Sequence, residues 1–546
     1  MEPVAAVALD RRPPRPPEAA LRATATPTAT TKRHDRGGIP RAVALVTALH
    51  LLLLVGYSVL VPVFRAPDEY VHVDLMRHLA RTGDYPAFDD LFVSAPVIAA
   101  RDTSPAYVSF TDPVGAAEAV PSAQRPAFAD LGPEVPTAAA NQMPQHPPLY
   151  YGLGAAVLAA VPDDMPFDRT VAVLRLVDVA LVAAVPLLAW ATARRLGCPP
   201  AVALTAAVLV LAVPQFTHIG SVVNNDVLLV ALSAVLFLLA ARVVTGDLSR
   251  RTAVLAGVVT GLALLTKGFA LVLAPWIVGA YLLAPGARDR WRPVLTRLGQ
   301  VVGLATAIGG WWWVRNVVVH GTVQPGLRLR SPAEGGVDAD PVFFLTRFAG
   351  RLLSSAWGDF GWLEVSIPPA AIGVATVVLV AAVAAAFVRG RGAAGRARAA
   401  LFMFPALALV GLVAAGAWKA YLKTGTPYAS QGRYLFPGLV GLVVVAAVGL
   451  GHLSAGRRRH LPLFAFAGAV AMQVTAVVTI AGRYWAGGSA IERGRALLAF
   501  SPWPPALVLF LAAAVVVVAG WTAVELVRGA DRRSGGWGSG LAGSAR

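Results

Sequence analysis

Long apolar runs alternate with short polar segments along most of the chain. Each run approaches the roughly 20 residues that a helix needs to cross the hydrocarbon core of a bilayer. The pattern predicts an all-α polytopic membrane protein with about twelve spans. The runs occupy residues 42–64, 171–193, 199–214, 227–244, 252–266, 269–284, 295–314, 367–388, 399–417, 435–453, 461–481 and 504–527.

A further apolar run, residues 147–161, would add a thirteenth span if it crossed the membrane, but it is short and begins with two prolines. Cytoplasmic loops are enriched in Lys and Arg. A crossing here would place nearly every later arginine cluster outside, whereas a helix that dips into the outer interface leaves all of them inside. We therefore expect 147–161 to stay on the outer side. The clusters are Arg194-Arg195, Arg250-Arg251, 288–292, 389–398, 457–459 and Arg532-Arg533.

This orientation assigns both termini to the cytoplasmic side of the cell membrane. Residues 1–40, rich in Pro, Thr and Arg, are expected to be disordered. Residues 41–528 are expected to form one transmembrane domain with extracytoplasmic loops at 64–170 and 318–366. Residues 529–546, which contain Gly-Gly-Trp-Gly-Ser-Gly, are expected to be a flexible cytoplasmic tail.

The composition agrees with a membrane protein and excludes some other classes. Hydrophobic residues make up 56% of the chain and charged residues 14%, and the mean hydropathy is +0.63. The net charge of +17 comes from arginines in short loops, so it does not indicate nucleic-acid binding. Cys198 is the only cysteine, which excludes an intramolecular disulfide and a cysteine-rich metal site.

An acidic motif, Asp68-Glu69 with His72 one helical turn later, follows the first apolar run. Ionised groups are excluded from hydrocarbon, so such a motif collects where water, a cation or a substrate meets the membrane surface. Two interpretations are open. The carboxylates cap a helix that begins after Pro67 and lies in the interface, or they provide a general base or a divalent-cation site.

Two basic residues also lie at predicted outer ends of spans. Lys267 is one of four lysines and separates two apolar runs with almost no loop around it. It either snorkels to the interface or pairs with a lipid-borne phosphate. Arg433, in Gln431-Gly-Arg-Tyr-Leu-Phe-Pro437, lies outside against the charge bias, and we expect it to have an anionic partner.

Several other polar positions have both a structural and a functional interpretation. Asn224-Asn-Asp226 opens an apolar run, as a helix cap or as part of a site. Trp357-Gly-Asp-Phe-Gly-Trp362 is an interfacial anchor or a sugar-stacking platform. Inside the second run, Arg175 and Asp178 are expected to pair with each other, and His50 in the first is expected to be a packed core residue. Further candidates for substrate contact on the outer side are His146, Arg315 and Tyr434.

The order of these motifs resembles the GT-C superfamily of membrane glycosyltransferases, which includes protein mannosyltransferases, aminoarabinose transferases and oligosaccharyltransferases. It looks more closely like a bacterial family of predicted membrane proteins without an assigned function. The resemblance covers roughly residues 42–481. It is carried by Pro67-Asp-Glu-x-x-His72, His146-Pro-Pro-Leu-Tyr-Tyr151, Asn225-Asp226, Leu265-Thr-Lys267, Trp357-Gly-x-Phe-Gly-Trp362 and Gln431-Gly-Arg-Tyr-Leu-Phe-Pro437.

The resemblance implies a GT-C-like helical bundle that transfers a sugar from a polyprenyl-phosphate carrier to an extracytoplasmic acceptor. Carried over by position, Asp68 with Glu69 would be the base, and Asp226 would organise the site or bind metal. The resemblance implies no certain cofactor. A divalent cation, Mg or Mn, would be held by Asp68 and Asp226, but Asn-Asn-Asp departs from the Asp-x-Glu motif of metal-using relatives.

The residues implied to contact substrate are His72, His146, Lys267, Arg315, Trp362, Arg433 and Tyr434. The partners are thus a lipid-linked sugar, an acceptor and the lipid bilayer. Two other functions remain open: a transporter of lipid-linked glycans or solutes, although no inverted repeats are visible, and a non-catalytic subunit of envelope assembly.

Overall fold

The computed structural model describes residues 38–103, 120–326, 337–390, 392–428, 430–485 and 487–531. From Arg41 onwards, these described residues belong to one compact unit. Nearly all of the segment expected to be disordered, 1–40, lies outside the described residues, as does 532–546. The last helix, α20, continues through Asp531 and so includes the first residues of the segment 529–546, which was expected to be a flexible tail.

Most of the expected spans are helices of membrane-crossing length and composition, which confirms an all-α polytopic membrane protein. Among the described residues, eight candidates are long and apolar enough. They are α1 (Arg41–Leu60), α5 and α6 together (Phe167–Val182, Val185–Arg195), α9 (Asp226–Val244), α15 (Pro369–Val388), α16 (Gly392–Thr424), η8 with α17 (Gly432–Gly438, Leu439–Leu453), η9 with α18 (Ala455–His460, Leu461–Tyr484) and α20 (Pro505–Asp531).

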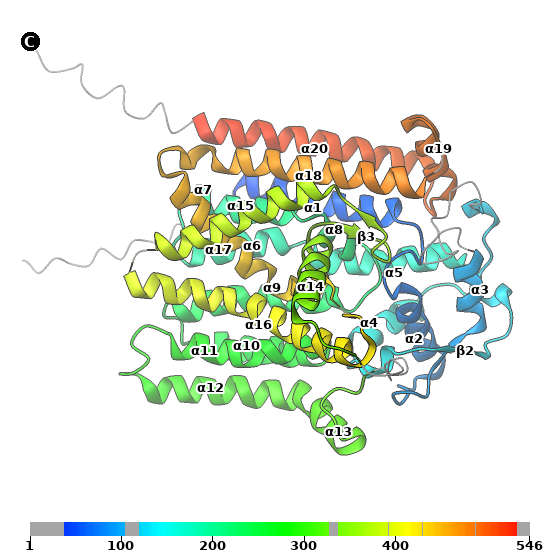
Figure 1. Cartoon of the computed structure of the whole chain (residues 1–546), viewed down its shortest axis with the longest axis horizontal. Coiled ribbons are helices and arrows are strands. Elements are labelled where there is room, and N and C mark those ends of the chain that lie inside the picture. Colours follow the sequence, from blue (N-terminus) through cyan, green and yellow to red (C-terminus); the bar gives the residue numbers. More distant parts are fainter. Residues whose placement is uncertain are drawn as a thin grey trace, which may run out of the picture. The chain divides into compact units, whose positions relative to one another are not determined.

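The other four expected spans are shorter helices, so twelve crossings remain a prediction. They are α7 (Pro200–Leu211), α10 (Arg250–Leu264), α11 (Leu273–Leu282) and α12 (Trp291–Ala305), which η7 (Thr306–Gly310) joins to α13 (Trp311–His320). In Figure 1 the long helices run side by side along the horizontal direction.

The bundle is packed tightly at its centre and is apolar at its surface. At Gly261 and Gly309 a side chain would collide with the facing helix, so these glycines allow α10 and η7 to approach closely. By contrast, only 17% and 11% of the apolar windows of α15 and α20 are buried. Their exposed valines, and Phe510 of α20, would face hydrocarbon in a bilayer.

The first long loop folds against one end of this bundle. Figure 1 shows α2, α3 and β2 gathered there. Its elements are α2 (Glu69–Thr82), β1 (Phe92–Ser94), α3 (Ala95–Thr103), η3 (Ser122–Gln124), η4 (Phe128–Leu131), β2 (Pro136–Ala140), η5 (Met143–Gln145) and α4 (Leu149–Leu158). Strands β1 and β2 are antiparallel, with Phe92 opposite Ala140 and Ser94 opposite Pro136.

Two features hold this loop in place. The ion pair between Arg125 Nη1 and Asp168 Oδ2, at 3.0 Å with both side chains fully buried, ties the loop to the start of α5. Helix α4 packs against α2. At ten residues and about 1.5 Å per residue it is only about 15 Å long, half the thickness of the hydrocarbon core. Its length therefore fits a helix that remains on one side of the membrane.

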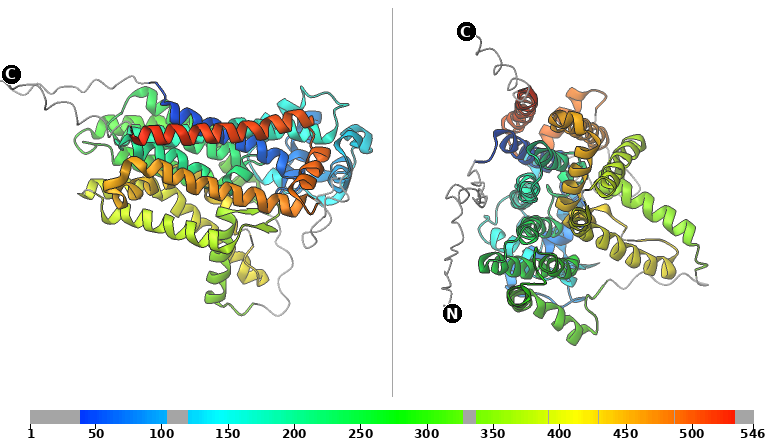
Figure 2. Two further views of the ribbon diagram at one scale, coloured as in Figure 1. Left: turned by 90° about the horizontal axis from the view of Figure 1, so that it is seen from above. Right: turned by 90° about the vertical axis from the view of Figure 1, so that its left-hand side faces the viewer.

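The second long loop lies at the same end of the bundle. It contains α14 (Pro341–Trp357) and the short antiparallel strands β3 (Asp359–Phe360) and β4 (Val365–Ser366). Figures 1 and 2 show α14 running across the long helices. Its apolar face, including Phe344 and Phe348, packs with Val413 and Tyr421 of α16. The remaining elements are α8 (Pro214–Ile219), η6 (Gly268–Val272) and α19 (Ala490–Phe500).

Candidate functional site

The site begins at the turn between α1 and α2, where the two adjacent carboxylates have different surroundings. Asp68 precedes α2 with φ 63° and ψ 8°, a left-handed conformation that few non-glycine residues adopt. Its side chain makes no capping hydrogen bond to the helix. It is 24% exposed, whereas Glu69 is completely buried. The backbone turn therefore directs Asp68 away from its neighbour.

Glu69 is fully engaged by protein donors. Arg175 donates from Nε to Oε1 and from Nη2 to Oε2, both at 2.7 Å. The backbone N–H groups of Phe64 and Val223 donate to the same carboxylate at 2.8 and 3.1 Å. Arg175 also donates to the carbonyls of Ser58, Val61 and Pro62. This buried pair joins α1, α2 and α5 to the segment before α9.

The expected pairing of Arg175 with Asp178 is therefore wrong. Asp178 instead accepts hydrogen bonds from the Tyr150 hydroxyl at 2.8 Å and from the Asn224 N–H at 3.0 Å. Asn224 Oδ1 in turn accepts from the Asp226 N–H at 3.1 Å. These bonds fix the turn that starts α9, so the Asn224-Asn-Asp226 motif is both a helix start and a support for the site.

Two carboxylates and two cations meet next to this turn. Arg433 Nη2 donates to Asp68 Oδ2 at 2.9 Å, and its Nε lies 3.7 Å from Asp226 Oδ2. Lys267 Nζ donates to Asp226 Oδ1 at 2.7 Å and to Asn225 Oδ1 at 3.0 Å. The first loop, α9, the α10–η6 junction and η8 each supply at least one of these residues.

Local structure places both cations. Lys267 follows α10 in an extended conformation. Two residues earlier, the Leu265 carbonyl accepts a hydrogen bond from the N–H of Leu149, so the start of α4 lies next to this segment. The Lys267 ammonium lies 5.4 Å from the ring centroid of Tyr434. Burial lowers the pKa of Lys267, while the Asp226 carboxylate opposes this shift. Arg433 is held because Ser355 Oγ accepts the N–H of Gly432 at 2.8 Å.

His72 and His146 border the same cluster as neutral groups. His72 Nδ1 lies 3.0 Å from the Tyr151 hydroxyl, which also accepts a hydrogen bond from Asn225. Burial, followed by the positive charge of Lys267, holds the pKa of both imidazoles well below its ordinary value. They can therefore accept or donate hydrogen bonds near neutral pH without adding charge.

Several buried polar atoms of this cluster make no hydrogen bond to another described residue. They are Arg433 Nε, Asp226 Oδ2, His146 Nδ1 and Gln431 Oε1. Buried polar groups are normally paired, so each such atom needs a physical reason. Their gathering around Arg433 provides donors and acceptors for a polar ligand.

Arg315 and Trp362 lie at the edges of this arrangement. The Trp362 ring lies 6.2 Å from that of Tyr70, and its Nε1 is 3.4 Å from the Phe64 carbonyl oxygen. The Arg315 guanidinium lies 5.2 Å from the ring centroid of Trp312, which packs on Tyr85. Tyr85 donates its hydroxyl proton to the His146 carbonyl at 2.7 Å. Arg315 is thus linked to His146 through Trp312 and Tyr85, and Trp362 lies beside Tyr70 of α2, which follows Asp68 and Glu69 in the chain.

The donor set does not fit a divalent cation held by the protein. No group of three or more His, Cys, Asp or Glu residues is arranged to bind a metal among the described residues. Mg²⁺ can be bound by one or two carboxylates together with water and substrate phosphate, but here the guanidinium of Arg433 lies between Asp68 and Asp226. The two expected metal ligands are neutralised by Arg433 and Lys267, so we derive no step through a metal.

Comparison with known proteins gives one match to a family and several to solved structures. Residues 150–313 match the family model for dolichyl-phosphate-mannose-protein mannosyltransferase. No curated protein sequence matches. This family match confirms the resemblance to polyprenyl-phosphate-dependent GT-C glycosyltransferases over that part of the chain. The matched segment, residues 150–313, contains Tyr150, Asp226 and Lys267.

The solved structures are distant in sequence. ArnT from Cupriavidus metallidurans, bound to undecaprenyl phosphate, is 15% identical with a TM-score of 0.47, over 89% of this chain and 75% of that chain. The archaeal oligosaccharyltransferase AglB from Archaeoglobus fulgidus, in complex with an inhibitory peptide and a dolichol-phosphate, is 14% identical with a TM-score of 0.40, over 85% of this chain and 60% of that chain.

Proposed function

We propose that the protein is a glycosyltransferase that moves a sugar from a polyprenyl-phosphate carrier to a hydroxyl-bearing acceptor outside the cytoplasm. The observation that carries this proposal is the meeting of Arg433 and Lys267 with Asp68 and Asp226 at one end of the bundle. A phosphate leaving group gains negative charge as its bond to sugar breaks, and preorganised cations stabilise that charge. The family match over residues 150–313 supports the same donor class.

Asp68 is the proposed base. Of the three carboxylates, Asp68 alone has an exposed part, 24% of its side chain, while Glu69 and Asp226 are completely buried. Asp68 takes the proton of the acceptor hydroxyl while the hydroxyl oxygen forms a bond to the anomeric carbon of the sugar. The bond from that carbon to the phosphate oxygen breaks, and the carrier leaves as polyprenyl phosphate.

Arg433 links donor binding to the state of this base. Its Nη2 pairs with Asp68, while its Nε makes no hydrogen bond to a described residue. A donor phosphate that approaches Nε competes with Asp68 for the same guanidinium, since forked contacts to phosphate are strong. Donor binding then weakens the Asp68–Arg433 ion pair and leaves Asp68 Oδ2 available to accept a hydrogen bond from the acceptor hydroxyl.

Glu69 and Asp226 are assigned positioning roles. All four hydrogen bonds to Glu69 come from Arg175 and two backbone N–H groups, so an acceptor proton has no access to it. Asp226 holds Lys267 and faces Arg433. The resemblance implied Asp68, with Glu69, as the base, and the geometry favours Asp68 alone.

The test is binding of a short-chain polyprenyl phosphate to purified wild type, Arg433→Ala and Arg433→Lys. We expect Arg433→Ala to weaken binding roughly tenfold or more, because hydrogen bonds to charged groups contribute about 1.5–3 kcal/mol. Arg433→Lys restores the charge but not the fork, so it should recover binding only in part. Arg347→Ala, at an exposed position of α14, is the matched control.

Equal affinity of wild type and both Arg433 variants would overturn the assignment of a lipid-phosphate donor to this site. Binding without transfer to any acceptor, in a wild-type preparation that exchanges the lipid between leaflets, would favour a transporter instead.

A further inference from the structure

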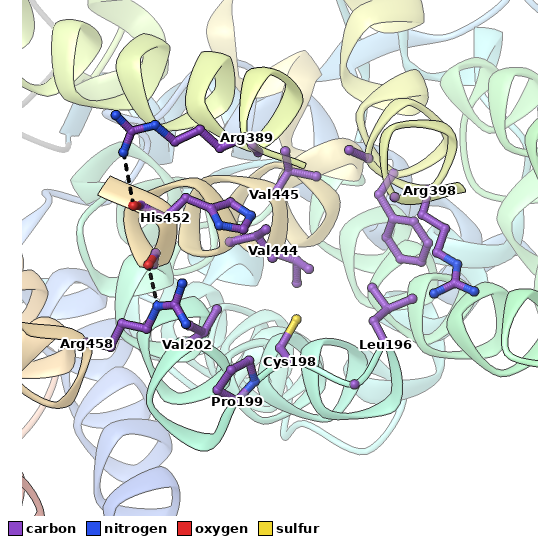
Figure 3. Close-up of a pocket in the computed structure, with 17 residues that line it drawn as sticks. Leu196, Cys198, Pro199, Val202, Arg389, Arg398, Val444, Val445, His452 and Arg458 are labelled. Atoms are coloured by element: carbon purple, nitrogen blue, oxygen red, sulfur yellow. Dashed lines mark hydrogen bonds between the residues drawn. The ribbon is translucent and has the colours of Figure 1, made fainter. Parts of the chain in front are cut away.

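A second basic site lies at the other end of the bundle. A cavity of about 430 Å³ opens between the α6–α7 turn, the end of α15, the start of α16 and the end of α17 (Figure 3). Arg433 precedes α17, whereas the cavity residue His452 lies in its last turn and Arg458 follows it in η9. The length of α17 therefore separates this cavity from the candidate glycosyl-transfer site.

The cavity is strongly basic. Arg389, Arg398, Arg458 and His452 line it, and none of its described lining residues is acidic. Arg389 donates to the His452 carbonyl at 3.2 Å, and Arg458 donates to the Gly451 carbonyl at 2.6 Å. Figure 3 shows these two guanidiniums on one side and Arg398 on the opposite side. The three guanidinium charges around this cavity repel each other, and an anion between them would offset this repulsion.

Helix ends do not explain all of these charges. The carbonyls at the ends of α15 and α17 favour nearby cations, which accounts for Arg389 and Arg458. Arg398 has no such support, because it is the seventh residue of α16 and lies near the helix N-terminus. Its side chain is exposed at the mouth of the cavity.

The walls between the arginines are apolar. Val202, Phe402, Val444, Val445 and Val448 line the cavity together with Cys198. A free inorganic anion would gain nothing from such a surface, whereas an acyl chain would bury apolar area against it. Basic pockets between membrane helices are suited to lipid head groups. The combination favours an anion that carries an apolar tail.

We propose that this cavity binds the phosphate of an anionic phospholipid from the leaflet at this end, which the arginine bias predicts to be cytoplasmic. The phosphate lies between Arg398 and the Arg389–Arg458 pair, and one acyl chain lies along the valines of α17. This site is independent of the proposed glycosyl transfer.

Cys198 offers a built-in reporter because it is the only cysteine in the chain and lines the cavity. It is 9% exposed, and burial raises the pKa of its thiol to about 11. The experiment uses the full-length protein in detergent with phosphatidylglycerol, with phosphatidylcholine, or with inorganic phosphate. The readouts are the rate at which a small neutral maleimide modifies Cys198 and the phospholipid retained in native mass spectrometry.

We expect phosphatidylglycerol to slow Cys198 modification and to be retained, with little effect of the other two additives. Arg398→Gln should weaken phosphatidylglycerol binding roughly tenfold. This exposed side chain has little role in folding, and Arg458→Gln is a second test. Arg288→Gln with Arg292→Gln, exposed arginines that do not line the cavity, is the matched control and should bind as wild type does.

Equal protection by phosphatidylcholine, or equal phosphatidylglycerol binding by Arg398→Gln, Arg458→Gln and wild type, would overturn the proposal. Protection by inorganic phosphate alone at the same concentration would also overturn it, since it would show an anion site without a place for a lipid tail.

Discussion

Replacing Glu69 by Gln tests whether this carboxylate stabilises the fold or takes part in catalysis. Glutamine keeps the shape and one carbonyl oxygen of Glu69, but its NH₂ group cannot accept the hydrogen bonds made to the second oxygen. Arg175 would then be a buried cation, 1% exposed, without its counterion. Removing one partner of a buried ion pair costs about 3–5 kcal/mol. Because the shift in Tm per kcal/mol becomes smaller as the chain becomes longer, to about 1 °C at this length, the Tm should decrease by roughly 3–5 °C.

Asp68→Asn is the matched comparison because it changes the neighbouring carboxylate in the same way. The Asp68 side chain is 24% exposed, and Arg433 keeps a second carboxylate, because its Nε lies 3.7 Å from Asp226 Oδ2. Asp68→Asn therefore leaves Arg433 with a counterion, and its Tm should decrease less than that of Glu69→Gln. Transfer should decrease by roughly 10²–10⁴-fold through loss of the base.

The assay is thermal unfolding of the purified proteins in detergent, followed by tryptophan fluorescence, together with transfer activity at a temperature where all variants are folded. The double variant Glu69→Gln with Arg175→Met removes both charges, and it should be more stable than the sum of the single effects predicts. A wild-type Tm for Glu69→Gln, with activity as low as that of Asp68→Asn, would refute the supporting role and place Glu69 in the chemistry.

Three further predictions concern orientation, pH and charge. In a Cys198→Ser background, Asp163→Cys should react with a membrane-impermeant thiol reagent in intact cells and Asp289→Cys only after permeabilisation; the reverse would overturn the orientation. Burial raises the pKa of Asp359 to about 6, so the folded state favours its protonated form and loses that stabilisation as pH rises through about 6. The Tm of Asp359→Asn minus that of wild type should therefore be more positive at pH 7.5 than at pH 5, and an unchanged difference would contradict this. Lys267→Met should raise the donor KM roughly tenfold, whereas the exposed control Lys419→Met should not.

The sequence was most informative where function and topology restrict a residue to the end of a span. Four residues lie at predicted outer ends of spans: Asp68, Asp226, Lys267 and Arg433. Residues that are confined to one end of a helical bundle lie within a small area. The sequence therefore indicated these residues as a group. It could not indicate which atoms form ion pairs, because the pairing depends on how the helices rotate and pack against each other.

The Glu69–Arg175 pair shows this limit. Its members are 106 positions apart in the chain, and Asp178, one turn from Arg175, offered a closer partner in sequence. The tertiary fold instead brings Arg175 to three carbonyls of α1 and the following turn, and to Glu69. Asp74 of α2 is a second buried carboxylate whose partners are distant in the chain. The Ser94 N–H and the Asn141 side chain, 20 and 67 positions away, donate hydrogen bonds to it.

The most direct test of the proposed transfer is the profile of lipid-linked sugars in cells that lack this protein. We expect one polyprenyl-phosphate sugar to accumulate in the deletion strain. The same sugar should accumulate when Asp68→Asn is expressed at wild-type levels, and wild-type protein should remove it. An unchanged profile in the deletion strain, under conditions in which the wild-type gene is expressed, would contradict the use of a polyprenyl-phosphate donor.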